Sequence, residues 1–339
     1  MIKEELHKIK EKLLASDKKK LLSISTTANV NNPDFVVGSL RETETTLAGN
    51  IILRSANYIE EIISFFDGLV DYFLLDPEVK NELHDLEQHA KKWIKKSKYL
   101  VYKPNDFTVA ALDMLIAVKS GSLAGKKIAI LGSGNIGAKT ALVLCERGAH
   151  VYLYDKDAEK SEKVAIGFNL VAKSIQKIIP VSTMEEIKEI DIVIGCTPGI
   201  KAITKEIVIK TKNYLVDAGN GCFTGEAIAC AKETNKPIYV LSSFPGYYGM
   251  IENWIKTMAM NERKKIKKVS SLVSLISPGI LGTRGDILVD NPENPTKIIG
   301  ICDGTGDVLY GTEAVDEMEK ILSDIDDPAL KKKLRSLYF

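Results

Sequence analysis

The sequence lacks an excess of charge of either sign, and it lacks long apolar runs. Its 339 residues include 46 Lys and Arg against 45 Asp and Glu, which leaves a formal net charge of +1. So even a balance gives no electrostatic reason to expect nucleic acid as a partner. No apolar run approaches the length of a membrane span, and the charged, amphipathic residues 1–14 predict a helix instead of a signal peptide. We therefore expect a cytoplasmic protein that binds neither nucleic acid nor a membrane.

Cysteine is scarce, and its spacing forms no recognisable framework. The five cysteines are Cys145, Cys196, Cys222, Cys230 and Cys302. They include no C-x-x-C pair and have no histidine cluster near them. Such spacing disfavours zinc sites and disulfide frameworks and fits a reducing compartment. We therefore predict no metal site.

The pattern that is present alternates strands with helices. The alternation is weak up to the segment S-G-S-L-A-G-K at residues 120–126 and clear beyond it. Short apolar strands separated by helices are typical of a mostly parallel sheet with helices on both faces. The sequence therefore predicts an α/β fold. We expect a smaller α/β substrate domain at 1–120, a Rossmann-type sheet domain at 121–265, and a C-terminal extension of strands and helices at 266–339.

Periodicity also predicts the positions of individual elements. In the first half, apolar runs predict strands at 34–39, 68–75 and 99–102, and helical spacing predicts helices at 56–66, 78–95 and 108–119. In the second half, strands are predicted at 127–131, 150–154, 191–195, 214–217 and 237–241, and a long helix at 248–263. Strands at 286–289 and 297–301 are expected in the extension.

A glycine motif stands between the first strand and helix of the predicted Rossmann domain. Residues 127–137 run K-I-A-I-L-G-S-G-N-I-G, and Asp155 ends the next strand, 18 residues after Gly137. In such a unit Gly132 permits the tight turn, Gly134 lets a pyrophosphate approach the backbone, and Gly137 lets the helix pack on the strand. A carboxylate at Asp155 would accept hydrogen bonds from ribose hydroxyls and repel a 2′-phosphate. The motif therefore predicts NAD, with NADP less favoured; the alternative is a glycine turn without a ligand.

Further cofactor contacts are expected where later strands end, because ligands bind outside the carboxyl ends of parallel strands. The segment C-T-P follows one strand, and D-A-G-N ends the next. Asp217 in the second segment is as well explained by capping a turn. The predicted contacts in these loops are Gly132, Ser133, Gly134, Asn135, Ile136, Gly137, Asp155, Lys156, Cys196, Thr197, Pro198 and Gly219.

The order of these motifs resembles the amino-acid-dehydrogenase-like two-domain NAD(P) oxidoreductases. That group includes methylenetetrahydrofolate, methylenetetrahydromethanopterin and shikimate dehydrogenases and glutamyl-tRNA reductases. L-V-D-A-G-N at 215–220 and P-G-Y-Y-G at 245–249 are similar to loops of the folate enzymes, and the resemblance implies that Gly249 lies near the nicotinamide. It also implies hydride chemistry in an interdomain cleft. The sequence shows neither the N-terminal lysine motif of shikimate dehydrogenases nor the Tyr-x-x-x-Lys helix of folate dehydrogenases.

Candidate catalytic residues precede the Rossmann domain. Lys103 and Asp106 could shuttle a proton and polarise a carbonyl, whereas Asn105 could hold substrate; Asn105 or Asp106 could instead cap the next helix. Arg41 lies in a polar segment suited to a carboxylate or phosphate, or in a plain surface loop. Tyr247 and Tyr248 could stack on a substrate ring or pack in the core.

Together these features predict an NAD(H)-dependent oxidoreductase. It would transfer a hydride to or from a small polar metabolite, either a keto or hydroxy acid or an imine or amino compound. Two alternatives stay open: a one-carbon methylene dehydrogenase acting on a pterin or folate, and a non-catalytic NAD-binding sensor or scaffold. We also expect a homodimer.

Overall fold

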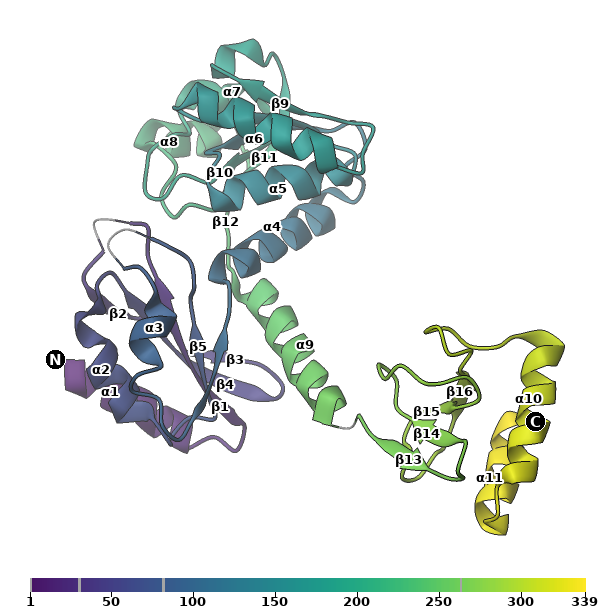
Figure 1. Cartoon of the computed structure of the whole chain (residues 1–339). Coiled ribbons are helices and arrows are strands. Elements are labelled where there is room, and N and C mark those ends of the chain that lie inside the picture. The colour runs from purple at the N-terminus through teal and green to yellow at the C-terminus, as the bar shows by residue number, and fades with distance from the viewer. Residues whose placement is uncertain (1, 30–31, 81–82, 263) are drawn as a thin grey trace. The chain divides into compact units, whose positions relative to one another are not determined.

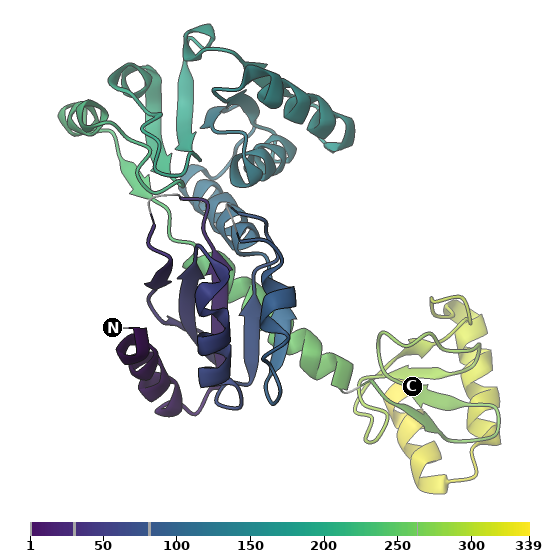
Figure 2. The same ribbon diagram turned by 60° about the vertical axis from the view of Figure 1, so that its left-hand side comes forward.

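The computed structural model describes residues 2–29, 32–80, 83–262 and 264–339. The chain forms two compact units, Met1–Glu252 and Asn253–Phe339, and each is described by itself. The first unit contains two separate sheets, which Figures 1 and 2 show from two directions. The predicted boundaries at 120/121 and 265/266 stay predictions.

The N-terminal sheet has six strands in the order β2-β4-β1-β5-β6, with β3 beside β4. β1, β4, β5 and β6 are mutually parallel, whereas β2 and β3 run antiparallel to β4. Apolar residues of this sheet and of α1, α2 and α3 form one buried cluster on one face. The strands are β1 (Lys19–Thr26), β2 (Phe35–Val37), β3 (Arg41–Glu42), β4 (Thr46–Leu53), β5 (Tyr72–Leu75) and β6 (Lys98–Val101). The helices are α1 (Ile2–Leu14), η1 (Ala56–Tyr58), α2 (Ile59–Phe66) and α3 (Leu86–Ala90).

The two faces of the N-terminal sheet differ in polarity. Leu22 and Ile24 of β1 lie in the apolar cluster, whereas Ser23 and Ser25, at the alternate positions, are buried outside it. Because successive side chains of a strand point to opposite faces, the serines lie on the face away from the cluster. Tyr102, which follows β6, makes a short hydrogen bond to Ser23 on that face.

The second sheet is fully parallel, with the strand order β12-β11-β10-β7-β8-β9. Two apolar clusters pack against its two faces, as expected for a sheet covered on both sides by helices. The predicted Rossmann-type α/β class is thus confirmed. The strands are β7 (Lys127–Leu131), β8 (His150–Tyr154), β9 (Ile178–Val181), β10 (Ile190–Gly195), β11 (Thr211–Asp217) and β12 (Ile238–Val240). The helices are α4 (Pro104–Ser120), α5 (Asn135–Glu146), α6 (Ala158–Val171), η2 (Met184–Glu186), α7 (Lys205–Lys210) and α8 (Gly225–Glu233).

Helix α9 (Phe244–Glu262) begins after β12 and returns toward the N-terminal sheet. A Cβ atom at Gly246 would lie 2.0 Å from the carbonyl oxygen of Phe107, so α9 crosses α4 at very close range. Glu252 accepts hydrogen bonds from the amide and hydroxyl of Thr45, which precedes β4.

The second unit is a small four-stranded sheet with two helices packed on it (Figure 1). The apolar side chains of α10 and α11 share one buried cluster with those of the sheet. The strand order is β13-β14-β15-β16. The elements are β13 (Ile266–Lys268), β14 (Ser274–Ile276), β15 (Ile287–Val289), β16 (Ile298–Ile301), α10 (Gly311–Asp324) and α11 (Pro328–Tyr338).

The predicted elements need three corrections. β1 and β4, the longest strands of the N-terminal sheet, were not predicted, nor was β9. The predicted helix at 78–95 is wrong except for α3, Leu86–Ala90, and positions 81 and 82 lie outside the described residues. P-G-Y-Y-G is not a turn but part of the first turns of α9, which begins at Phe244; residue 263, the end of the predicted helix, lies outside the described residues.

Candidate functional site

A cavity of about 900 Å³ lies in the first unit and is lined from both of its sheets. Its lining residues follow the carboxyl ends of β7, β10, β11 and β12 on one side and of β1, β5 and β6 on the other. Ligands of parallel α/β sheets bind at this edge. The lining contributed by the second sheet comprises Gly134, Asn135, Ile136, Cys196, Pro198, Ala218, Gly219, Asn220, Leu241, Ser242 and Ser243. The other side includes Ser25, Thr26, Thr27, Asn29, Asn32, Arg41, Glu78, Lys80, Asn105, Phe107 and Thr108.

The glycine loop has the geometry that a pyrophosphate needs. Gly132 has a φ of +104°, and a Cβ atom at Gly137 would lie only 1.9 Å from the carbonyl oxygen of Gly132. Around Gly134, in contrast, a Cβ atom would meet nothing within 4 Å among the described residues. Gly134 is also the N-cap of α5 and provides no side-chain cap, so the first amides of the helix face the cavity unbonded by a side chain. These residues fit a dinucleotide, whose phosphates would lie on the α5 N-terminus.

Asp155 is fixed to the glycine loop. Its Oδ2 atom accepts hydrogen bonds from the backbone N of Ser133 at 2.7 Å and from the Ser133 hydroxyl at 2.8 Å. Partial burial opposes ionisation, but these bonds outweigh it and hold the pKa of Asp155 below its ordinary value of 3.8. Lys160 lies 3.7 Å away, and its neighbour in the sequence prediction, Lys156, is exposed. Neither Asp155 nor Lys156 is among the described residues that line the cavity.

The loops after β10 and β11 pack tightly against each other. A Cβ atom at Gly219 would lie 2.2 Å from the carbonyl oxygen of Thr197. Asp217 accepts hydrogen bonds from the amides of Gly219, Gly221 and Cys222, so it caps this turn. Its cap role, one of the two expected for it, is thus the one with contacts in the structure.

The cysteines of these loops are poor nucleophiles. Burial raises the pKa of the Cys196 thiol and that of Cys222. Cys222 donates to the carbonyl oxygen of Thr197 at 3.1 Å. Cys196 lines the cavity as a packing surface beside the glycine loop.

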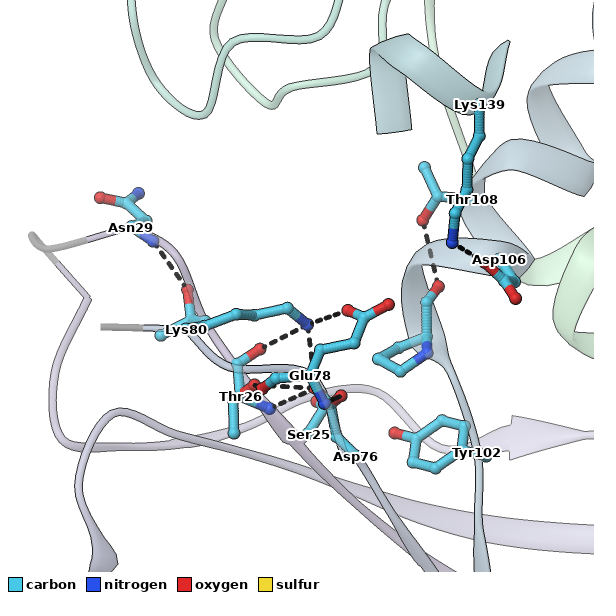
Figure 3. A network of polar contacts seen from close by, with 12 residues as sticks. Ser25, Thr26, Asn29, Asp76, Glu78, Lys80, Tyr102, Asp106, Thr108 and Lys139 are labelled. Carbon is cyan, nitrogen blue, oxygen red and sulfur yellow. Dashed lines mark hydrogen bonds and ion pairs between the residues drawn. The ribbon is translucent and has the colours of Figure 1, made fainter. Parts of the chain in front are cut away.

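The opposite wall carries an ionic cluster that the sequence analysis missed (Figure 3). Nζ of Lys80 lies 2.9 Å from Oδ2 of Asp76 and 2.7 Å from Oε2 of Glu78. The Asp76 side chain is completely buried, and those of Lys80 and Glu78 are 11% and 13% exposed. Asp76 also accepts hydrogen bonds from the amide and hydroxyl of Thr26, at the end of β1. Glu78 and Lys80 line the cavity, so a fixed ammonium group faces it.

A sequence signal for this cluster does exist. Asp76, Glu78 and Lys80 stand at alternate positions directly after the buried strand Y-F-L-L of β5. Charged residues at the carboxyl end of a parallel strand are candidates for a ligand site. The prediction of a helix from residue 78 concealed this, because it placed the last two on a helix surface.

Arg41 brings a second cation to the cavity. It lies on β3 at the sheet edge, and its guanidinium carbon is 5.0 Å from the centre of the Tyr247 ring. No carboxylate of the described residues lies within ion-pair distance of it. The ring therefore holds the guanidinium by a cation–π contact.

The predicted acid–base pair is not in the cavity wall. Of Lys103, Asn105 and Asp106, only Asn105 is among the lining residues. Asp106 lies 2.5 Å from Nζ of Lys103 and 2.5 Å from Nζ of Lys139 on α5, so it ties α4 to α5. Partial burial opposes ionisation, but these two lysines hold the pKa of Asp106 below its ordinary value. A carboxylate held in the charged form is badly suited to shuttle a proton.

The two tyrosines and Gly249 also lie apart from the cavity lining. Tyr247 is completely buried, with its ring 5.5 Å from that of Phe107. It contacts the site only through Arg41, as the core-packing alternative predicts. Tyr248 hydrogen-bonds to Glu44, which raises the pKa of its phenol, and Gly249 is exposed on α9.

Two further kinds of site have no support in the described part of the chain. There, no group of three His, Cys, Asp or Glu side chains is arranged to hold a metal ion. Within the same residues, every helix is too short or too polar to cross a bilayer.

The comparison with protein families places part of this unit. Residues 115–218, which contain the glycine loop and β7 to β11, match the shikimate/quinate 5-dehydrogenase family. The resemblance predicted from the motifs is thus confirmed for this segment. The match supports an oxidoreductase of the dehydrogenase type with a nicotinamide nucleotide as cofactor and a small molecule as substrate. No curated protein matches the chain in sequence.

Solved structures share only the general layout. The chain is similar to L-tryptophan dehydrogenase from Nostoc punctiforme, with 15% identity, a TM-score of 0.42, and coverage of 71% of this chain and 75% of that one. A shikimate dehydrogenase in complex with NADP+ has 13% identity and a TM-score of 0.40, covering 66% and 84%. The catalytic subunit of M. jannaschii aspartate transcarbamoylase has 13% identity and a TM-score of 0.42, covering 75% and 96%. At these scores the likeness identifies no activity.

Proposed function

We propose that the chain is an NAD(H)-dependent oxidoreductase that reduces or forms a carbonyl-type group of a small carboxylate-bearing metabolite. The observation that carries this proposal is that one cavity is lined both by the glycine loop and by Lys80 and Arg41. A nicotinamide nucleotide held by the glycine loop would supply or accept the hydride. The wall opposite it carries groups that can bind and protonate a substrate.

In this proposal Lys80 is the proton-transferring group. When a carbonyl carbon gains a hydride, its oxygen needs a proton to become a hydroxyl, and a positioned ammonium can donate it. Lys80 is then neutral and regains a proton from solvent. Asp76 and Glu78 hold Nζ in place, at 2.9 Å and 2.7 Å, and favour its return to the charged form. The reverse reaction uses the same residues in the opposite order.

Arg41 is proposed to bind the substrate carboxylate. Its guanidinium can form two parallel hydrogen bonds to such a group. The Tyr247 ring fixes it without neutralising it, and no described carboxylate competes for it. Asn105, Thr108 and the hydroxyl-bearing residues after β1 add neutral donors and acceptors to the same cavity.

The preference for NAD follows from Asp155. Its charge would repel a 2′-phosphate, and its position beside the glycine loop is supported by the two bonds from Ser133. The predicted cofactor contacts of Ser133, Asn135, Ile136, Lys156, Thr197 and Pro198 belong to this proposal, as do the homodimer and the cytoplasmic location, which stay predictions.

A pterin or folate substrate has less support. It would require aromatic rings in the cavity to stack on the pterin, and Phe107 is the one aromatic residue among the described lining residues. Tyr247 and Tyr248, expected to provide such a cleft, lie outside the lining. The non-catalytic sensor is distinguished by experiment.

Titration with NADH and NADPH, followed by turnover assays on 2-keto and 2-hydroxy acids, tests the proposal. We expect NADH to bind and Lys80→Met to lower turnover by about 10²-fold or more while leaving NADH affinity within about twofold. Lys80→Arg, which keeps the charge but not the geometry, is the matched control and should lose most of the turnover too. Absence of binding by either nucleotide would sink the proposal, and NADH binding without turnover on any acid would favour the sensor.

A further inference from the structure

We propose that Glu78 forms a subsite for a protonated amine, so that the substrate carries an ammonium group in addition to its carboxylate. The inference rests on the proposed function, since the subsite lies in the same cavity, but it concerns a different part of the ligand. It narrows the substrate class to small amino acids and other amino-bearing carboxylic acids.

The first observation is an unpaired oxygen of Glu78. Its Oε2 atom faces Nζ of Lys80 at 2.7 Å, whereas its Oε1 atom is buried and has no hydrogen-bond partner among the described residues. Figure 3 shows this carboxylate projecting from the cluster, beyond the Lys80 side chain. A carboxylate oxygen can only accept, so the group it lacks is a donor. Because a buried polar atom without a partner costs free energy, a ligand that supplies the donor gains affinity.

The second observation is the charge of the cluster. Asp76 and Glu78 contribute two carboxylates, and Lys80 contributes one ammonium group. The cluster therefore carries one excess negative charge in a largely buried place. Such a charge favours a cationic donor over a neutral hydroxyl.

Neighbouring cations do not supply that charge. Lys103 is near enough for Glu78 to raise its pKa slightly, but Asp106 is the main cause of that shift and pairs with Lys103 at 2.5 Å. Lys80 already shares its ammonium between two carboxylates. The excess charge of the cluster is thus left for the ligand.

The third observation is the opposite charge elsewhere in the same cavity. Arg41 lines it as a cation with no described carboxylate partner. A ligand with one carboxylate and one ammonium group would neutralise both Arg41 and Glu78. A hydroxy acid would satisfy Arg41 alone.

Matched ligand pairs with one carbon skeleton test this inference. The probes are L-alanine with L-lactate, L-aspartate with L-malate, and L-leucine with L-2-hydroxyisocaproate, titrated calorimetrically into the full chain with NADH present. We expect at least one amino member to bind about tenfold tighter than its hydroxy partner. Glu78→Gln should lower the affinity of that amino acid about tenfold and change that of the hydroxy acid less than twofold. Glu189→Gln, which also removes one carboxylate from a lysine pair but lies on the surface, should change neither.

The outcomes separate this inference from the proposed function. Hydroxy acids that bind or turn over as well as their amino partners, with or without Glu78, overturn the amine subsite and leave the oxidoreductase intact. Failure of every amino member to bind also overturns the subsite. Failure of NADH to bind overturns the proposed function itself.

Unfolding temperature gives a second readout that needs no ligand. If Glu78 waits for a cation, Glu78→Gln removes an uncompensated charge and leaves the melting temperature unchanged or higher. Asp76→Asn, in contrast, should lower it by several degrees, because Asp76 accepts four printed contacts within the fold, from Thr26, Glu78 and Lys80. A fall for Glu78→Gln as large as that for Asp76→Asn would show that Glu78 is a structural partner of Lys80, and would overturn the subsite.

Discussion

The ammonium of Lys80 lies 2.9 Å from Oδ2 of Asp76, a carboxylate that is completely buried at the end of β5. The same oxygen accepts hydrogen bonds from the amide and hydroxyl of Thr26, at 2.9 Å and 2.8 Å. Asp76 therefore joins β5 to the end of β1 and fixes Lys80 at the cavity. One residue thus serves both the fold and the proposed chemistry.

Asp76→Asn should damage stability and turnover together. The amide keeps the shape of the side chain but leaves Lys80 with half of its negative partners, and removing one member of a buried pair costs about 3–5 kcal/mol. We expect chemical denaturation to show a loss in this range. Turnover should fall at least tenfold, because Nζ is no longer held at one position.

Activity of the surviving folded Asp76→Asn protein decides between the two roles. Assays are made at a temperature where circular dichroism shows full folding. Wild-type turnover under those conditions would mean that Asp76 stabilises the sheet without positioning Lys80.

Two glycines of the same loop should respond differently to alanine. At Gly137 a Cβ atom would lie 1.9 Å from a backbone oxygen, so Gly137→Ala should destabilise or prevent folding. At Gly134 the space is open and φ is −68°, so Gly134→Ala should fold normally. That methyl group would instead stand where the pyrophosphate approaches, and NADH affinity should fall about tenfold or more.

Melting temperature and NADH fluorescence titration check this pair. The expected result is a stability loss confined to Gly137→Ala and an affinity loss without a stability loss for Gly134→Ala. Full NADH affinity in Gly134→Ala would contradict the assignment of this loop as the phosphate site.

Asp155 should set the choice of nucleotide. Asp155→Asn removes the charge that repels a 2′-phosphate, so the ratio of NADPH to NADH affinity should rise about tenfold. Ser133→Ala removes the hydroxyl bond to Oδ2 but keeps the backbone bond and the charge. It should therefore lower NADH affinity only a few fold and leave the nucleotide preference unchanged. A shift in preference in Ser133→Ala, or none in Asp155→Asn, would exclude the electrostatic explanation.

The second sheet could be predicted from the sequence because its strands are buried on both faces. K-I-A-I-L and D-I-V-I-G are continuous apolar runs, and the glycines between strand and helix have a backbone reason for their spacing. The glycine loop and the strand-end loops were therefore found, and several of their residues line the cavity.

The N-terminal sheet escaped prediction for a physical reason. β1 reads K-K-L-L-S-I-S-T, with Ser23 and Ser25 on the face away from the apolar cluster, and Asn50 of β4 is likewise buried. Polar residues on one face interrupt the runs by which buried parallel strands are recognised. Ser25 lines the cavity, so the feature that concealed the strand belongs to the candidate site. Lys80 was missed for the related reason that charged residues after β5 suggested an exposed helix.

Asp106 should contribute to stability in a pH-dependent way. Its pKa in the folded protein lies below the ordinary value of 3.8, because the bonds from Lys103 and Lys139 outweigh its partial burial. A lowered pKa means that the folded state favours the carboxylate, so the stabilisation is full at neutral pH and is lost as the pH falls through the lowered pKa. Since Lys103 and Lys139 are partly exposed, solvent screening limits the contribution to about 1 kcal/mol. Asp106→Asn should therefore be less stable than the wild type at pH 7 and approach it near pH 3.

Urea denaturation across this pH range, with Lys139→Met and the double variant, apportions the effect. Lys139→Met leaves the Lys103 pair in place, so it should cost less than Asp106→Asn, and the double variant should cost less than the two single changes added together. A pH-independent difference between Asp106→Asn and the wild type would mean that the loss comes from packing between α4 and α5. Turnover measured on the same variants at pH 7 completes the test: because Asp106 lies outside the cavity lining, Asp106→Asn should retain most of it, and a loss comparable to that of Lys80→Met would return Asp106 to the catalytic role predicted from the sequence.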